Sequence, residues 1–148
     1  MMTKFLVDRM LGQTAKWLRL LGIDAEYAPK CEDDRLKEIA KKEDRVILTR
    51  DKELSMYEDA LYVKERDIDE ILMKVMDRFE FDIKPFTRCS LCNGEVKPID
   101  KNKIKNNVPE GVYERNDSFW RCKNCEQIYW EGSHWDKIMA KIEKFKDK

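Results

Sequence analysis

Residues 5–8, Phe5-Leu6-Val7-Asp8, form a short apolar run that stops at an acid. An uncharged run of large apolar side chains with this length predicts a buried strand. The next segment, residues 10–21, repeats apolar side chains at helical spacing, and Gly22 supplies a stop. A strand followed at once by an amphipathic helix is the first half of a βαβ unit.

The same alternation of strand and helix continues toward residue 79. We expect further strands over residues 23–27, 46–48 and 61–63. Between them a helix is expected to begin at Asp33-Asp34, and a last helix covers residues 68–79, where apolar side chains recur three and four apart. Strands alternating with helices in this way predict an α/β fold with a small parallel sheet.

The composition excludes several classes of protein. The 148 residues carry 30 basic and 30 acidic side chains and one His, so the net charge is zero. That balance argues against a basic nucleic-acid arm and a polybasic membrane anchor. Hydrophobic residues make up 42% of the chain, enough for a core, yet no run approaches the ~18 apolar residues of a membrane span. The sequence predicts a cytoplasmic protein without a membrane partner.

Two cysteine pairs dominate the second part of the chain. They are Cys89-Ser90-Leu91-Cys92 and Cys122-Lys123-Asn124-Cys125. Four thiolates at this spacing in a reducing compartment point to a tetrahedral structural Zn²⁺. Two redox or disulfide pairs are the weaker interpretation, and an iron–sulfur site is a minor alternative.

A domain boundary is expected after Pro85, because proline resists continuation of a helix. Residues 1–85 would then form the α/β domain. Residues 86–148 would form a zinc ribbon whose strands are joined by loops, followed by a helix from about Ser133 to the end.

Acidic side chains stand at the predicted strand ends. Asp8 follows the first strand, Asp51 follows the third and Asp67 follows the fourth, while Asp33 and Asp34 begin the helix after the second. The carboxyl ends of parallel strands meet at one edge of a sheet, where ligands collect. Carboxylates that converge there repel one another unless a cation such as Mg²⁺ or Mn²⁺ lies between them. The structural alternative is that all of them except Asp8 cap helices.

Basic side chains border the same predicted edge. Arg9, Lys16 and Arg50 would neutralise substrate phosphates there. The alternative, favoured for Lys16, is that these side chains only solvate the surface.

Three motifs resemble one known family. The opening of the PIN-like ribonucleases named for the C-terminal part of the Mut-seven exonuclease is similar to Phe5-Leu6-Val7-Asp8-Arg9-Met10-Leu11-Gly12, continued by Ala15-Lys16-Trp17-Leu18-Arg19-Leu20-Leu21-Gly22. A strand end of that family resembles Val46-Ile47-Leu48-Thr49-Arg50-Asp51, and its zinc ribbon resembles the two cysteine pairs. The resemblance covers nearly the whole chain.

This resemblance implies a PIN-like fold and a metal-dependent ribonuclease site with Asp8 and Asp51 as acidic ligands. A third acid is expected near the second helix, where we choose Asp34 and keep Asp33 as the alternative. PIN sites often use a fourth acid, for which the candidates are Asp67 and Asp69.

The sequence therefore predicts a metal-dependent ribonuclease with RNA as its partner. A Mg²⁺ or Mn²⁺ ion held by Asp8, Asp34 and Asp51 would activate water, and Zn²⁺ would be structural. The alternative is a non-catalytic RNA- or protein-binding adaptor of the same fold. Whether the ribbon contacts RNA or is purely structural stays open, as do the oligomeric state and the RNA substrate.

Overall fold

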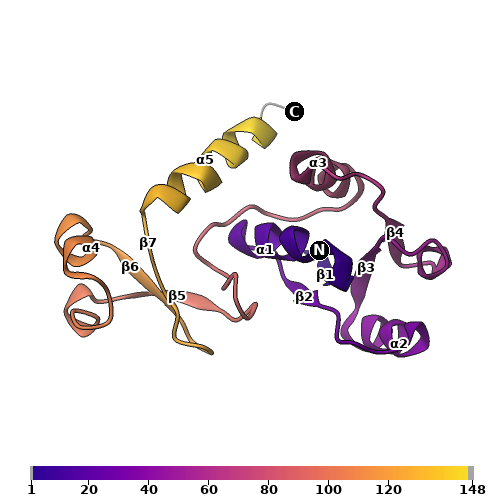
Figure 1. Ribbon diagram of the computed structural model, residues 1–148, viewed down its shortest axis with the longest axis horizontal. Helices are drawn as coiled ribbons and strands as arrows, with labels where there is room; N and C mark the ends of the chain where they lie inside the picture. Colours follow the sequence, from indigo (N-terminus) through magenta and orange to yellow (C-terminus); the bar gives the residue numbers. More distant parts are fainter. Residues whose placement is uncertain (1, 147–148) are drawn as a thin grey trace. The chain divides into compact units, whose positions relative to one another are not determined.

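A four-stranded parallel sheet forms the centre of the first of two units into which the chain divides. The computed structural model describes residues 2–146, and its first unit comprises residues up to 19 together with 23–82. The strands lie in the order β2-β1-β3-β4 (Figure 1). Their bounds are β1 (Lys4–Val7), β2 (Ala25–Tyr27), β3 (Arg45–Thr49) and β4 (Ala60–Tyr62). All three pairings are parallel, which confirms the predicted α/β fold class.

Helices connect these strands across both faces of the sheet. They are α1 (Gly12–Leu20), α2 (Asp33–Glu43) and α3 (Ile68–Arg78), with short 3₁₀ turns at η1 (Arg9–Leu11) and η2 (Leu54–Met56). Because β2 and β3 flank β1 on opposite sides, right-handed crossovers place α1 and α2 on opposite faces, as Figure 1 shows.

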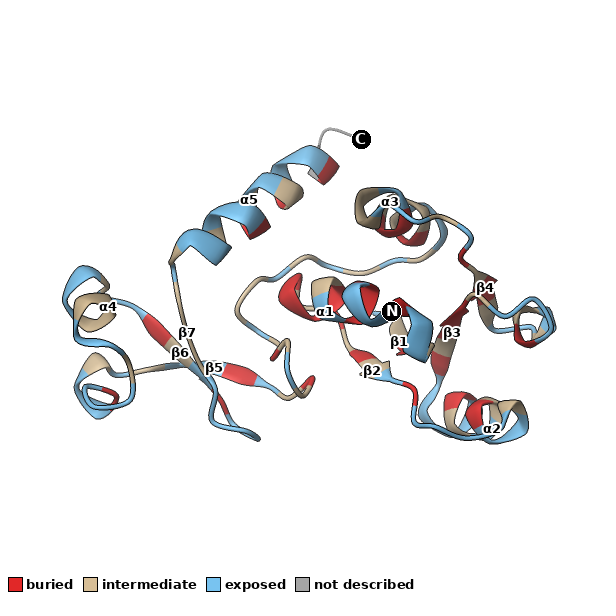
Figure 2. Cartoon of the chain, viewed as in Figure 1, coloured by how far each residue is buried: buried red, intermediate tan, exposed pale blue. Residues whose placement is uncertain are grey.

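The core of this unit is built on β1 and β3, which are buried along most of their length (Figure 2). Continuous burial is typical of parallel strands that are covered on both faces. On one face, Leu36 of α2 packs with Leu6 and Ile47. Elsewhere in the core, the ring of Phe5 meets that of Phe79 edge to face, with centroids 5.5 Å apart. The apolar runs that predicted strands are therefore the residues that form the core.

The helix ends follow local sequence signals. Asp67 accepts a hydrogen bond from the backbone N–H of Glu70 at 3.2 Å, so it caps α3 as predicted. At the carboxyl end of α2, Asp44 takes the left-handed conformation with φ 56°, and its N–H donates to the carbonyls of the last helical turn.

The second unit comprises residues 20–22 and the chain from residue 83 on, built around an antiparallel sheet. Its strands, in the order β5-β6-β7, are β5 (Val96–Ile99), β6 (Phe119–Cys122) and β7 (Ile128–Trp130). A 3₁₀ turn, η3 (Lys101–Lys103), and a helix, α4 (Glu110–Arg115), lie between β5 and β6, and α5 (Ser133–Lys146) follows β7. The sequence did not predict α4, because it is six residues long and contains no buried residue to set a period.

Aromatic side chains pack inside this second unit. The ring of Phe86 stacks on Trp120 with centroids 4.1 Å apart and on Trp135 at 4.8 Å. Trp120 also packs against the buried cluster of Cys89, Val96 and Cys122. Among the described helices of both units, none has the length and apolar character that crossing a bilayer requires.

Candidate functional site

The carboxyl ends of β1 and β3 form the topological switch point of the parallel sheet. From β1 the chain passes to β2 on one side, and it later returns to β3 on the other side. In open α/β sheets the crevice outside such a point is where ligands bind. Val7 and Leu48 are paired in register, so the residues that follow them, Asp8 and Thr49, lie next to each other at this edge.

Asp8 is fixed to the end of the neighbouring strand. Its Oδ2 accepts a 2.7 Å hydrogen bond from the hydroxyl of Thr49, and its backbone N–H donates to the carbonyl of Leu48 at 2.8 Å. Its Oδ1 lies 3.4 Å from the N–H of Met10, at the start of η1. Asp8, which looked free of any structural role, therefore also caps the turn after β1.

Asp51 is joined to the same point through Thr49. The hydroxyl oxygen of Thr49 accepts a 2.9 Å hydrogen bond from the N–H of Asp51 while donating to Asp8. The exposed carboxylate of Asp51 accepts hydrogen bonds through Oδ1 from Glu53 at 2.9 Å and from Leu54 at 3.3 Å. The structural alternative for Asp51, capping of the following short helix, is thus also present in the structure.

Thr49 is the site residue that the sequence analysis missed. It is fully buried, and its hydroxyl links the ends of β1 and β3. The available signal was a hydroxyl residue at the last position of a buried strand, two residues before a candidate ligand.

Asp34 is placed differently from the other two predicted acids. It lies in the first turn of α2 with its side chain 93% exposed, 3.9 Å from the Nζ of Lys37. Within residues 2–146, the four cysteines are the one group of three or more candidate ligands that come within 4.8 Å of one another. The structure thus links Asp8 and Asp51 through Thr49 but does not assemble a three-acid group with Asp34.

The three basic side chains that we expect to contact phosphate differ in whether hydrogen bonds hold them in position. Arg50 is half-buried, and its Nη2 donates to the carbonyl of Glu65 at 2.7 Å. Arg9 is exposed in η1, where its carbonyl accepts a hydrogen bond from the hydroxyl of Tyr27. Lys16 is exposed on α1. Only the Arg50 guanidinium is positioned by a hydrogen bond from its own charged group.

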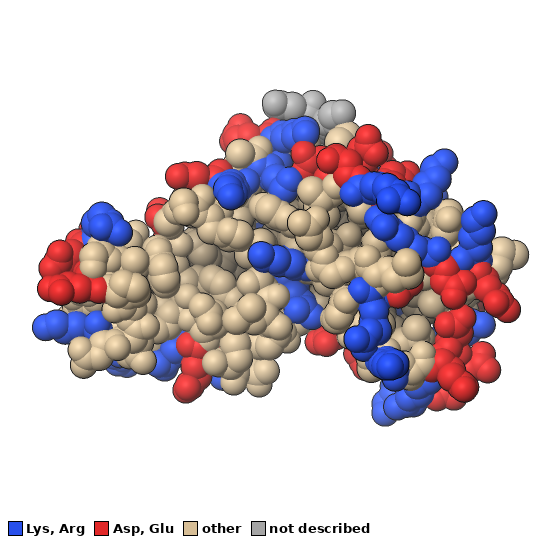
Figure 3. Space-filling model, in the orientation of Figure 1, with Lys and Arg blue, Asp and Glu red and all other residues tan. Residues whose placement is uncertain are grey.

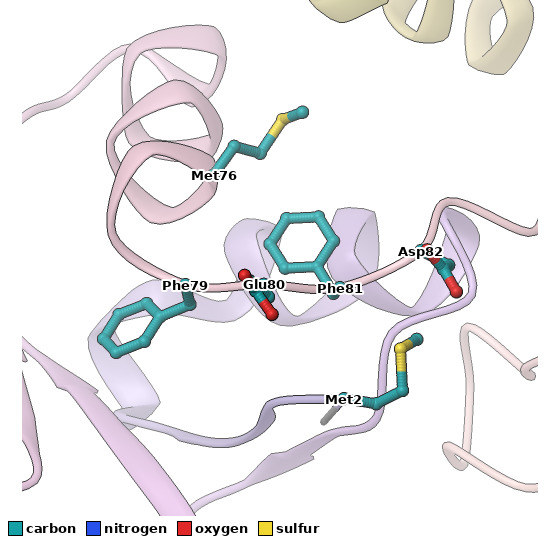
Figure 4. A pocket seen from close by; sticks show the side chains of 6 residues that line it. All are labelled: Met2, Met76, Phe79, Glu80, Phe81 and Asp82. Atoms are coloured by element: carbon teal, nitrogen blue, oxygen red, sulfur yellow. The ribbon is translucent and has the colours of Figure 1, made fainter.

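A cavity of the first unit lies away from the carboxyl edge of the sheet. It has a volume of about 430 Å³ and is lined by Met2, which precedes β1, by Met76 of α3 and by residues 79–82 (Figure 4). Because β1 runs from Lys4 to Val7, this cavity opens at its amino end, whereas Asp8 follows its carboxyl end. It is therefore separate from the acidic site.

The four cysteines of the second unit converge on one point. Their sulfur atoms lie within 4.8 Å of one another, with Cys89 and Cys125 3.6 Å apart and Cys92 and Cys122 3.5 Å apart. Zn–S bonds of about 2.3 Å in a tetrahedron give S···S distances of about 3.8 Å, so the group fits one Zn²⁺. A disulfide requires about 2.05 Å, and all five cysteines are free thiols in the structure.

The two cysteine turns repeat one backbone geometry. Asn93 and Glu126, which follow the second cysteine of each pair, both have φ 67°. Each donates its N–H to the carbonyl of the first cysteine, at 2.9 Å and 3.0 Å respectively. Gly94 lies so close to the cluster that a Cβ at this position would be 3.0 Å from the Cys122 sulfur and 3.1 Å from the Cys92 sulfur. The matched turns aim two sulfur pairs at the same centre.

Polar groups around the Cys92 sulfur favour its thiolate, whereas burial raises the pKa of Cys125 to about 12. Burial alone would raise the pKa of Cys92, but hydrogen bonds from the Asn124 side chain and the Gly94 backbone lower that pKa to about 6. The hydroxyl of Tyr129 lies 2.9 Å from the Cys89 sulfur. Burial, with the adjacent Cys89, raises the pKa of Tyr129, which keeps this hydroxyl protonated as a donor. The cluster therefore has the donors expected around a structural metal.

Comparison with known proteins gave a match that spans both the acidic site and the cysteine cluster. A family model described as the Mut7-C RNAse domain matches residues 3–142, a span that contains the strand-end acids and all four cysteines. A search of curated proteins found no match.

Proposed function

We propose, because this chain belongs to the Mut7-C RNAse domain family, that it is a metal-dependent ribonuclease whose site is formed by Asp8 and Asp51. The observation that carries the proposal is the hydroxyl of Thr49, which joins these two acids at the switch point of the parallel sheet. A position at that edge is where an α/β fold offers a crevice to a substrate.

The donors at this edge suit a hard divalent ion. Mg²⁺ is usually held through one or two carboxylates, with waters and substrate phosphates completing its shell. Asp51 accepts its hydrogen bonds through Oδ1, so Oδ2 is available to an ion. When bound, Mg²⁺ or Mn²⁺ would supply Lewis acidity and an activated water for attack on an RNA phosphodiester.

Asp34 is our proposed third ligand. Its side chain is 93% exposed, so it can turn toward a bound ion without disturbing the core. Its position at the start of α2, after β2, places it on a segment that leaves the carboxyl edge of the sheet.

The chain's own residues would orient the substrate and the acids. The Thr49 hydroxyl holds the Asp8 carboxylate in one direction. Arg50, which follows Thr49 directly, would place its guanidinium charge near a substrate phosphate, and Arg9 and Lys16 would add charge at the rim. The four cysteines would hold a structural Zn²⁺ in the second unit.

A second candidate function is a non-catalytic adaptor that binds RNA or protein. The observation that favours it is that the three predicted acids do not form a group of close ligands.

RNA cleavage separates these two functions. Zinc-loaded protein is incubated with end-labelled unstructured and structured RNA, with Mn²⁺, with Mg²⁺, or without either ion. A ribonuclease should cleave only with an added ion, and Asp8→Asn should abolish cleavage. Asp77→Asn, which removes an exposed acid of α3, is the matched control and should cleave like the wild type. RNA binding without ion-dependent cleavage would instead support the adaptor.

A further inference from the structure

A second cavity adjoins the acidic site at the carboxyl edge of the sheet. It has a volume of about 220 Å³, and its polar lining comes from Gln13, Thr14, Arg50 and Arg66. Gln13 and Thr14 belong to the first turn of α1, and Arg50 stands between Thr49 and Asp51 in the sequence. The cavity is therefore only a few residues from both strand-end acids along the chain.

The side chains that line this cavity carry positive charge and no negative charge. Its lining includes two arginines and no acidic side chain. Arg50 donates through Nη2 to the Glu65 carbonyl, but its buried Nε has no acceptor among residues 2–146. Arg66 is exposed and takes part in no ion pair or hydrogen bond within the described chain.

The acids next to these arginines in the sequence make other contacts, since Asp51 and Asp67 accept hydrogen bonds from backbone N–H groups. The Glu65 carboxylate pairs with Lys74 at 3.2 Å, so it does not neutralise the arginines on either side of the cavity. Other arginines of this unit do have carboxylate partners: Arg45 contacts Asp24 at 2.7 Å, and Arg35 contacts Glu38 at 3.0 Å. Two guanidinium groups without such partners, facing one cavity, are arranged to receive an anion.

The remaining lining consists of two neutral polar side chains, Gln13 and Thr14, and four apolar ones, Met10, Leu11, Ile68 and Ile71, and the size of the cavity limits the ligand. Thr14 is 1% exposed, and it lines the cavity together with Gln13. A water molecule occupies about 30 Å³ in the liquid. A cavity of 220 Å³ therefore has space for a phosphate and part of its sugar but not for a folded partner segment.

We propose that this cavity is a subsite for a backbone phosphate of RNA next to the scissile bond, with Arg66 and Arg50 as its ligands. The inference rests on the proposed ribonuclease function. Arginine binds phosphate with two parallel charge-assisted hydrogen bonds, and that geometry matches a group with several equivalent oxygens. On the face drawn in Figure 3, basic and acidic side chains are interspersed.

Arg66→Gln tests the subsite, because Arg66 is exposed and its loss breaks no hydrogen bond or ion pair within the described chain. The affinity of zinc-loaded protein for a short single-stranded RNA is measured without added Mg²⁺ or Mn²⁺ at several salt concentrations. Arg66→Gln should weaken binding roughly tenfold and reduce the slope of log affinity against log salt by about 0.7, the value for one lost phosphate contact on a single strand. Arg66→Lys should retain part of the affinity, because it keeps the charge but not the paired donors.

Arg78→Gln is the matched control. Arg78 is also exposed in the first unit and does not line the cavity, so this variant should bind like the wild type. Equal effects of Arg66→Gln and Arg78→Gln would overturn the proposal. Arg66→Gln should weaken the binding of a 5′-phosphorylated RNA and of a 5′-hydroxyl RNA equally. A loss of affinity confined to the 5′-phosphorylated RNA would overturn the assignment to a backbone phosphate.

Cleavage measured on the same proteins keeps the two proposals apart. Ion-dependent cleavage by the wild type together with unchanged RNA binding by Arg66→Gln would leave the ribonuclease standing and overturn the subsite. Arg66-dependent binding without any cleavage would support the phosphate subsite and contradict the ribonuclease.

Discussion

The hydroxyl of Thr49 donates a 2.7 Å hydrogen bond to the carboxylate of Asp8, and this contact joins the ends of two strands that are 41 residues apart in sequence. The same oxygen accepts the N–H of Asp51. One buried side chain thus positions both acids that we assign to the ion, and it connects the stability of the sheet edge with the proposed chemistry.

Replacing Thr49 by valine should damage both properties. Valine keeps the shape but removes the hydroxyl, which leaves the Asp51 N–H without its acceptor and Asp8 without its strongest donor. We expect the free energy of unfolding to fall by about 1–3 kcal/mol. Ion-dependent cleavage should fall at least roughly tenfold, corresponding to about 1.4 kcal/mol in the barrier. Denaturant titration and single-turnover cleavage measure the two effects, and Thr49→Ser should restore most of both.

Two substitutions of Asp51 should separate its charge from its capping role. Asp51→Asn retains an oxygen that can accept from Glu53 and Leu54, so stability should change little while cleavage falls by roughly 100-fold or more. Asp51→Ala removes the acceptor as well and should cost about 1 kcal/mol in addition. Normal cleavage by Asp51→Asn would show that this carboxylate serves the turn alone.

Asp34→Asn tests the proposed third ligand. Because the Asp34 side chain is 93% exposed, the free energy of unfolding should stay within about 0.5 kcal/mol of the wild-type value. Cleavage at limiting Mn²⁺ should fall, and higher Mn²⁺ should partly restore it, since losing one ligand weakens ion binding. Asp33→Asn is the comparison, and a loss found only in that variant would move the ligand to Asp33.

Removal of one cysteine should act on the second unit. Cys92→Ser is expected to lose the one Zn²⁺ per chain and to increase amide exchange over the second unit much more than in β1 and β3. Cys31→Ser is the control, because Cys31 is an exposed thiol outside the cluster. Metal analysis that finds iron with sulfide, or a fully folded reduced protein without metal, would contradict the zinc assignment.

The sequence was sufficient for the parallel sheet and the cysteine cluster because both depend on local patterns. Buried strands such as Phe5-Leu6-Val7 carry their own apolar signal, and the cysteine turns repeat one spacing. The adjacent positions of Asp8 and Thr49 follow from the strand order, which the sequence did not predict. We expected a domain boundary after Pro85 from one local signal, the proline itself. The second unit comprises residues 20–22 together with the chain from Ile83 on.

Other features depend on contacts between distant residues and could not be predicted. The N–H of Lys84 donates to the carbonyl of Leu21 at 2.8 Å, which ties residues 20–22 to the second unit. The cavity lined by Arg50 and Arg66 likewise requires the end of β3 to meet the segment before α3. No period or spacing in the sequence encodes these pairings, because they arise only when distant segments pack together in the folded chain.

We propose that Asp8 and Asp51 hold the ion that serves RNA cleavage. The most direct test is a crystal of the zinc-loaded protein soaked in Mn²⁺, with the ion located by its anomalous scattering. We expect one Mn²⁺ bound directly by carboxylate oxygens of Asp8 and Asp51, and no such ion in Asp8→Asn crystals. Carboxylates more than about 10 Å apart, too far to share an ion whose ligand distances are near 2 Å, or a Mn²⁺ bound only elsewhere, would contradict it.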